Sequence, residues 1–441
     1  MSSDLPATEP VITVRRGLVL NPRALVTRLR TDPMLRNSAI YLVGSTLAGL
    51  LGYVFHFETG HLLGPSGYSV VASAIAALYV LNLPLIGLQL ASARYASIAA
   101  AREQLHAVAP MLMRLTALSL LAGLPVAAVL VIFANEFARF LNLSDVRIVY
   151  LLAGAELIGL VVTVNRGALQ GLRRFVSLSA NMVVDMTGRL VAAGAFVLSG
   201  LGPLGALAAL LVGPAIAYGQ SFVALRPRTA SQGPIDKIEG LGSYAALATV
   251  ASVGVNYLFS IDTLLAKHFL TADAAGVYAA AAVLARVVYF LGLSVSSVMF
   301  PEVATLHARN EGHFHVVDLA LLMVGTMGVA LIAAYSLFPG LVLLPYGPSF
   351  VPARSYLGVF ALALTLLAIA NLLINYLLSI ARRSFVIPLF GACILETLLI
   401  SLFHSSIWQI LTMVVITLGA LAGALGMMYV SDRVVARRVV V

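Results

Sequence analysis

The sequence predicts an all-α membrane protein of about twelve transmembrane helices, arranged as two parallel six-helix bundles around a central cleft. Three observations support this fold class. First, 61% of the 441 residues are hydrophobic and only 10% are charged, so the chain is more apolar than soluble domains are. Second, each bilayer crossing needs about 20 apolar residues, so the chain can hold about twelve crossings with short connections. Third, a sequence pattern recurs between its two halves.

Proline, glycine and charged residues separate the chain into apolar stretches. These lie near 36–61, 66–97, 108–134, 146–168, 176–199, 202–225, 240–267, 273–305, 314–338, 353–379, 384–403 and 405–430. Several follow residues that favour a helix start, because a side-chain oxygen accepts the first free N–H groups and proline loses no hydrogen bond there: Asp32-Pro33, Gly64-Pro65, Ser144-Asp145 and Thr271 to Asp273. The stretches are therefore predicted to be separate helices. In the last one, Gly419, Gly423 and Gly426 predict a close-packed face.

The basic residues are distributed unevenly between alternate connections. The net charge of +9 lies at helix ends and in short loops, which argues against nucleic-acid binding. Cytoplasmic loops collect Lys and Arg, and 20 of the 27 basic residues fall on one side, against Arg139, Arg147, Lys267 and Arg354 on the other. Both termini are therefore expected in the cytoplasm and the protein in the inner membrane. The first thirty residues hold five arginines and no seven-residue apolar stretch, so no cleavable signal is expected.

The most polar internal stretch, residues 226–238, divides the predicted spans six and six. The first span ends Tyr53-Val-Phe55-His-Phe-Glu58-Thr59, and the seventh ends Tyr257-Leu-Phe259-Ser-Ile-Asp262-Thr263. An offset of six spans is even, so the repeat is parallel, and two such bundles can rock around a cleft between them. The predicted organisation is a basic N-terminal segment (1–35), a first bundle (36–225), a cytoplasmic linker (226–238), a second bundle (239–430) and a basic cytoplasmic tail (431–441).

Motifs in the seventh and eighth predicted spans resemble those of a known family. They are Asp262-Thr-Leu-Leu-Ala-Lys-His-Phe-Leu, Ala275-Gly-Val-Tyr-Ala-Ala-Ala281 and Phe300-Pro301-Glu302. With them the chain resembles, over nearly its whole length, the MOP (multidrug/oligosaccharidyl-lipid/polysaccharide) flippase superfamily, and within it the polysaccharide-transport, Wzx-type branch. The resemblance implies a MATE/MOP-like fold and a flippase that moves an undecaprenyl-diphosphate-linked oligosaccharide across the inner membrane. The expected partners are this lipid-linked glycan, membrane lipids, a polysaccharide polymerase and glycosyltransferases.

Three arginines within spans are candidates for the substrate site, because an ionised side chain at mid-bilayer costs on the order of 3 kcal/mol and usually faces a cavity or a partner. They are Arg286, Arg189 and Arg114. Arg286 has no acid three or four residues away, and its guanidinium suits the two phosphates; the alternative is a structural pair with a glutamate on another helix. For Arg189 the alternative is an ion pair with Asp185, four residues away, and for Arg114 it is snorkelling to the headgroups.

Four acids are candidates for coupling to H⁺ or Na⁺. In drug-exporting relatives an acid in the first or seventh span binds the coupling ion, so the resemblance points to Glu58 and Asp262. A carboxylate that caps the turn or pairs with Lys267 is the alternative reading of these two. Glu156 and Glu396 lie deeper, where burial favours the protonated form, so they are alternative proton carriers. They are also the structural alternative as partners of the arginine in the eighth span.

Two rival functions differ from the flippase in what they require. A MATE-like H⁺- or Na⁺-coupled exporter of cationic small molecules would need an acidic cleft, whereas the deep charges here include three arginines. A membrane glycan polymerase or ligase would need catalytic residues on a sizeable outer loop, but the connections near 135–146 and 339–352 are short and have almost no acid/base pairs. The sequence shows no catalytic or metal-ligand constellation and no Walker-type glycine loop, so we expect a non-enzyme that needs no cofactor beyond the coupling ion. The single cysteine, Cys393, is expected to pack in the apolar interior.

Overall fold

The computed structural model describes residues 33–81, 85–102, 104, 108–225, 242–309 and 311–439, and these are almost entirely helical. The first half contains α2 (Pro33–Leu81), α3 (Leu85–Ala101), α4 (Val108–Ile132), α5 (Ala134–Phe140), α6 (Arg147–Gly171), α7 (Phe175–Phe196), the π-helical turn η2 (Val197–Leu201) and α8 (Gly202–Leu225). The second half contains α9 (Gly242–Leu258), α10 (Ile261–Phe269), α11 (Ala272–Ala308), α12 (Phe314–Leu337), α13 (Pro339–Leu343), the 3-10 turns η3 (Leu344–Tyr346) and η4 (Pro348–Ser355), α14 (Leu357–Ser379), α15 (Val386–Leu402) and α16 (Ile407–Val439). The predicted linker 226–238 lies outside the described residues.

The number of membrane crossings in the described residues agrees with the predicted twelve. Nine helical stretches are long and apolar enough to cross a membrane, and Val386–Leu402 is a shorter apolar helix. Two of the nine each contain a break that separates two crossings. In α2 the break is at Gly64, whose φ of 65° favours glycine, and the following Pro65 starts the next helix. Between α7 and α8 it lies at Gly200 and Gly202, with φ values of 91° and 55°. The prediction of an all-α membrane protein is therefore confirmed.

Two predicted helix starts are confirmed by their hydrogen bonds. The hydroxyl of Thr271 accepts from the backbone N–H of Ala274 and caps the start of α11. The carboxylate of Asp145 accepts from the backbone N–H and the guanidinium of Arg147, the first residue of α6. The hydrogen bond from the guanidinium lowers the pKa of Asp145. Such local contacts set where the helices begin, which is why they can be read from the sequence.

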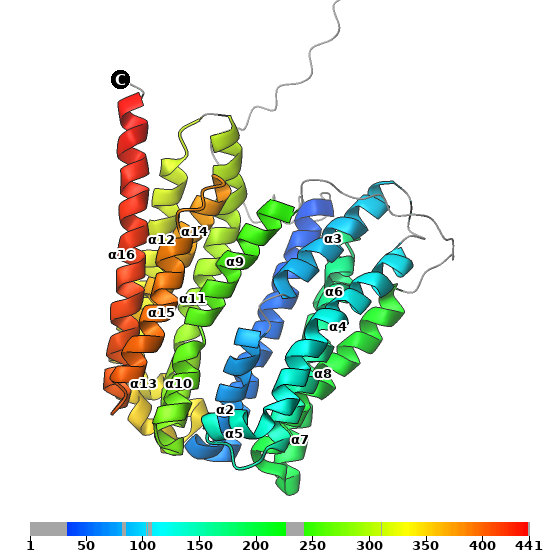
Figure 1. Cartoon of the computed structure of the whole chain (residues 1–441), viewed down its shortest axis with the longest axis vertical. Coiled ribbons are helices and arrows are strands. Elements are labelled where there is room, and N and C mark those ends of the chain that lie inside the picture. The colour runs from blue at the N-terminus through cyan, green and yellow to red at the C-terminus, as the bar shows by residue number, and fades with distance from the viewer. Residues whose placement is uncertain are drawn as a thin grey trace, which may run out of the picture.

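The two halves stand side by side with the same orientation (Figure 1). Helices α2 to α8 form one group and α9 to α16 the other, and α2 and α9 both run from the end drawn at the top toward the end drawn at the bottom. We call these the upper end, where α16 finishes, and the lower end, where α10 finishes. In the second half the central helix is α14, which is mostly buried and packs against α11, α12 and α16.

A cluster of contacts joins the halves at the lower end, and we call it the lower seam. The backbone of Pro65 in α2 lies so close to Gly276 in α11 that a Cβ on Gly276 would stand 1.9 Å from the Pro65 carbonyl oxygen. The hydroxyl groups of Tyr68 and Tyr346 are 3.1 Å apart and hydrogen-bonded. The side chain of Asn142 donates to the backbone oxygen of His268 at 2.9 Å. Helix α2 is therefore the main element through which the first half contacts the second at this end.

Candidate functional site

The seventh crossing is broken, and the break provides part of the candidate site. Helix α9 ends at Leu258 and α10 begins at Ile261, with Ser260 between them at a φ of −136°. A helix end leaves backbone carbonyl groups without their usual helical partners, and the Phe259 carbonyl accepts from Nη2 of Arg286 at 3.2 Å. Discontinuous helices near the middle of the membrane form substrate and ion sites in many transporters. The break therefore marks this region as the place to look for a site.

Arg286 lies at the boundary between the halves. It is fourteen residues into α11, or about 21 Å from the start of that helix at 1.5 Å per residue. Its guanidinium carbon is 4.4 Å from the ring centre of Phe259 and 5.8 Å from that of Tyr79, which belongs to α2 of the other half. The arginine is only 6% exposed, whereas Tyr79 is 40% exposed. Tyr79 is thus the accessible neighbour of a buried cation.

No carboxylate forms an ion pair with Arg286 within the described parts of the chain. The alternative of a structural pair with Glu156 or Glu396 is therefore wrong. A guanidinium has five N–H donors, and the Phe259 carbonyl accepts only one of them. The two aromatic rings add cation–π attraction, which stabilises the charge but occupies no N–H group. Arg286 interacts electrostatically with Asp262 of the same half but forms no ion pair with it, and its unused donors remain available to an anionic ligand.

The other two candidate arginines have different surroundings. Arg189 donates from Nε to Asp185 at 2.7 Å, which is the ion pair within one helix that the sequence offered as the alternative. Arg166 of α6 binds the second oxygen of the same carboxylate, also at 2.7 Å. Asp185 is 1% exposed, so it ties α6 to α7 inside the first half. Arg114 is exposed on α4. Of the three candidates, Arg286 is the one placed between the halves.

Asp262 is buried just after the break and is satisfied within its own half. Tyr278 donates to one of its oxygens at 2.9 Å, and the backbone N–H and hydroxyl of Thr263 donate to the other at 2.6 and 3.2 Å. The predicted alternative of a pair with Lys267 is wrong, because the lysine ammonium donates instead to Ser69 of the other half at 2.9 Å. Asp262 and Lys267 therefore do not pair with each other, although both belong to α10.

The remaining candidate acids lie in different halves. Glu396 of α15 is fully buried, neither of its oxygens has a hydrogen-bond partner among the described residues, and it is near enough to Asp262 for the two carboxyl groups to interact electrostatically. Glu156 of α6 is 1% exposed and has one unpartnered oxygen. Glu58 is half-buried and packs over Gly194 of α7. The structure thus brings Asp262 and Glu396 together and leaves Glu58 and Glu156 in the other half.

Sequence reasoning did not assign a role to Phe259 or Tyr79. Phe259 was noted only as a member of the repeated pattern, and its position immediately before the serine of the break was the signal that could have identified it. Tyr79 carries no such signal, because its contact with Arg286 depends on how the two halves pack.

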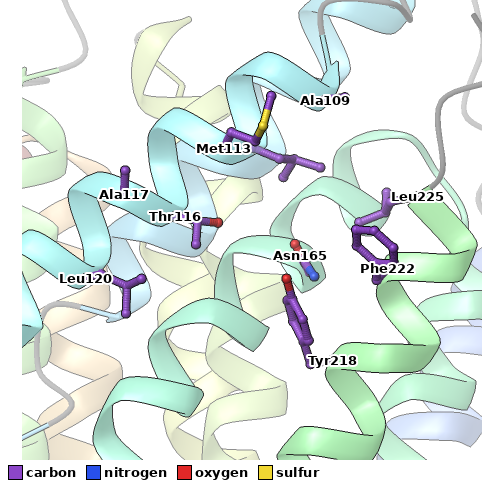
Figure 2. Close-up of a pocket in the computed structure, with 10 residues that line it drawn as sticks. Ala109, Met113, Thr116, Ala117, Leu120, Asn165, Tyr218, Phe222 and Leu225 are labelled. Carbon is purple, nitrogen blue, oxygen red and sulfur yellow. The ribbon is translucent and has the colours of Figure 1, made fainter. Parts of the chain in front are cut away.

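An apolar groove lies elsewhere in the first half, between α4 and α8 with α6 as its floor (Figure 2). It encloses about 390 Å³. Figure 2 shows Met113, Thr116 and Leu120 on one wall, Tyr218 and Phe222 on the other, and Asn165 beneath them. None of its lining residues is charged, so this groove has no group that could neutralise a phosphate.

Comparisons with known proteins identify relatives by family and by fold. A family model described as polysaccharide biosynthesis protein matches residues 34–307. No curated protein matches the chain in sequence.

Among solved structures, an inward-facing multidrug-resistance MATE family transporter of the MOP superfamily has 12% identity and a TM-score of 0.73, covering 90% of this chain and 99% of that one. An outward-facing transporter of the same description has 14% identity and a TM-score of 0.66, covering 94% and 98%. A MOP superfamily transporter from Pyrococcus furiosus, described as having a binding pocket of reverse polarity, has 15% identity and a TM-score of 0.58, covering 92% and 98%.

Proposed function

This chain belongs to the polysaccharide biosynthesis protein family and has the fold of MOP superfamily transporters, and from that premise we propose that it is a flippase for an undecaprenyl-diphosphate-linked oligosaccharide. The observation that carries the proposal is the buried guanidinium of Arg286, which lies between the halves and forms no ion pair with a carboxylate among the described residues. A diphosphate offers the negative charge and the paired oxygens that a guanidinium binds best. The guanidinium itself would repel a cationic drug, and the nearby carboxyl group of Asp262 is already hydrogen-bonded to Tyr278 and Thr263.

The proposed transport cycle follows from the arrangement of the two halves. The upper end, where the described part of the chain begins and ends, is assigned to the cytoplasmic side, and the lower end to the opposite side of the inner membrane. In the conformation described here the lower seam is closed, so substrate enters from the cytoplasmic side. Arg286 binds the diphosphate, the sugars cross through water between the halves, and the prenyl chain stays in the lipid. Rocking of the halves then opens the lower seam without unpacking either helical core.

The purified protein in proteoliposomes is expected to flip a prenyl-diphosphate-linked sugar that carries a fluorescent group. Dithionite, which cannot cross the membrane, destroys fluorescence in the outer leaflet, so flipping appears as a fall below the half that remains protected in empty vesicles. A MATE-like exporter would instead transport a cationic dye such as ethidium, and the same vesicles test that. Transport of ethidium, with the prenyl-diphosphate probe left protected, would reject the flippase in favour of the exporter.

We further propose that Asp262 and Glu396 carry the coupling H⁺ or Na⁺. The two carboxyl groups interact in the second half next to the broken crossing, and Glu396 has no hydrogen-bond partner among the described residues that would keep it permanently satisfied. A buried carboxyl group of this kind can take up a proton or a small cation at a much lower cost than it can remain charged and alone.

Glu396→Gln is expected to make flipping insensitive to H⁺ and Na⁺ gradients, because the amide has nearly the same shape but cannot release a proton. Flipping rates are measured with and without each gradient, in the wild type and the variant. Glu156→Gln is the matched control, since it makes the same change at a buried acid of the other half. Loss of gradient dependence in the Glu156 variant, with the Glu396 variant unchanged, would contradict the assignment and place the coupling site in the first half.

A further inference from the structure

Lys267 in α10 is the other almost completely buried cation in the described parts of the chain. Arg286 and Lys267 are the two lysine or arginine side chains that are nearly inaccessible there, at 6% and 3% exposure. The Lys267 ammonium has three donors, and the hydrogen bond that the structure shows for it goes to the hydroxyl of Ser69 at 2.9 Å. Ser69 lies in α2 of the other half and itself donates to the backbone oxygen of Ser66 at 2.6 Å. The contact is therefore part of the lower seam.

A hydroxyl group does not neutralise a buried ammonium. Burying a charge without a counter-charge costs several kcal/mol, and a methionine or glutamine at this position would join the halves without that cost. A lysine is therefore an unfavourable residue for a position that only holds the lower seam closed. The buried ammonium is explained if it binds an anion when the lower seam opens, because its hydrogen bond to Ser69 is then exchanged for solvent or a ligand.

The positions of the two buried cations give their spacing. Lys267 contacts Ser69 and Arg286 contacts Tyr79, and both partners belong to the same helical segment of α2 after Pro65. Ser69 and Tyr79 are ten residues apart, which corresponds to about 15 Å along the helix. A diphosphate is too short to span that distance, so the two cations are separate positions on one line between the halves, with Lys267 nearer the lower end.

We propose that Lys267 is a second anion-binding position, which receives the diphosphate from Arg286 after the lower seam opens. This inference rests on the proposed flippase function and extends it by assigning the exit step to a residue. Arg286 binds the anion in the closed-seam conformation described here, and Lys267 is then covered by Ser69. When the halves part at the lower end, the Lys267–Ser69 hydrogen bond breaks and the ammonium becomes available. The anion is drawn toward the lower end, and Arg286 is freed for the next cycle.

The proteoliposome assay separates this role from that of a simple seam contact. With the fluorescent prenyl-diphosphate-linked sugar as probe, Lys267→Gln is expected to lower the maximal flipping rate at least tenfold and to leave the apparent KM unchanged, because first binding occurs at Arg286. Lys267→Arg keeps the charge and should retain more than half of the rate. Ser69→Ala removes only the hydrogen bond of the closed seam and should also retain more than half. A Ser69→Ala rate as low as that of Lys267→Gln, or a normal rate in Lys267→Gln, overturns the proposal.

A second measurement tests the anion site without the lipid substrate. Ser69→Cys places a thiol beside Lys267, and a membrane-impermeant maleimide added on the lower-end side labels it whenever the seam opens; the native Cys393 is buried and serves as the unlabelled background. Inorganic pyrophosphate is expected to slow this labelling, and the added change Lys267→Gln should abolish the protection. If the probe lipid is never flipped but protection persists, the flippase proposal fails and the anion site stands. Labelling that pyrophosphate does not slow, or no labelling at all, overturns the anion site.

Discussion

Arg286→Ala is expected to reduce flipping of the prenyl-diphosphate-linked probe by about 100-fold or more while the protein still inserts and folds. Truncating one partner of a buried, hydrogen-bonded charge pair costs about 2–5 kcal/mol, and each 1.4 kcal/mol corresponds to a factor of ten. Removing Arg286 breaks no ion pair among the described residues, but it takes the hydrogen bond from the Phe259 carbonyl and the electrostatic attraction from Asp262, so folding is measured separately from transport. The measurement is the initial flipping rate at equal protein density, with thermal unfolding in detergent as the check on folding.

Two further variants separate charge from geometry. Arg286→Lys keeps the charge but loses the planar fork that binds two oxygens at once, so we expect a raised KM and partial flipping. Arg114→Ala removes an exposed arginine from α4 and should flip the probe nearly as fast as the wild type. Wild-type rates in Arg286→Ala would remove this residue from the substrate site, and with it the observation on which the proposed function depends.

The sequence predicted those parts of the fold that local chemistry controls. Stretches of apolar residues are set by the thickness of the bilayer, and the break at Gly64-Pro65 and the cap at Thr271 act within one or two turns of helix. The ion pair between Asp185 and Arg189 is equally local, since four residues bring two side chains onto one helix face. The residues that determine these features are close together in the sequence, so the features can be predicted from it.

Features that depend on packing between helices were not predictable in this way. Gly419, Gly423 and Gly426 were predicted to form a close-packed face, but a Cβ on Gly419 would meet only Leu366 at 3.9 Å and nothing lies within 4 Å of the Cβ positions of the other two, so this prediction is wrong. A glycine pattern allows close approach without requiring a partner. A pair between Asp262 and Lys267 was one alternative that the sequence offered, but Lys267 contacts Ser69 instead, because packing between the two halves determines its partner.

The repeat shows the same limit most clearly. Glu58 and Asp262 occupy matching positions in the two halves, yet Asp262 follows a broken helix and binds Tyr278, whereas α2 has no break just before Glu58. Gly67 and Gly276 also match; Gly67 packs within its own half against Leu63 and Pro203, whereas Gly276 touches Pro65 across the lower seam. The candidate site lies where the two halves differ in structure, whereas a sequence repeat shows only the positions at which they are similar.

Gly276→Val is expected to abolish flipping by preventing the lower seam from closing. A Cβ at this position would lie 1.9 Å from the Pro65 carbonyl oxygen and 2.5 Å from its carbon, and both are backbone atoms that no rotamer change can move. The two helices must therefore separate by at least an ångström at the point where the halves meet. Overpacking of this kind costs about 1–3 kcal/mol even for small additions, and the branched valine adds more. Flipping rate and maleimide labelling of Ser69→Cys from the lower-end side are the two measurements.

The two readouts should move in opposite directions, which distinguishes a trapped conformation from a misfolded protein. Flipping falls because a transporter that cannot close one end cannot complete its cycle, while labelling at position 69 becomes faster because the seam stays open. Gly325→Val is the matched control: Gly325 is also a helical glycine of the second half, but nothing lies within 4 Å of its Cβ position, so the same change should leave both readouts close to wild type. Gly276→Ala should give an intermediate result, because it adds the Cβ alone. If Gly276→Val instead flips the probe normally, the halves do not need this contact to close, and the lower seam would lose its role as the gate on which both buried cations depend.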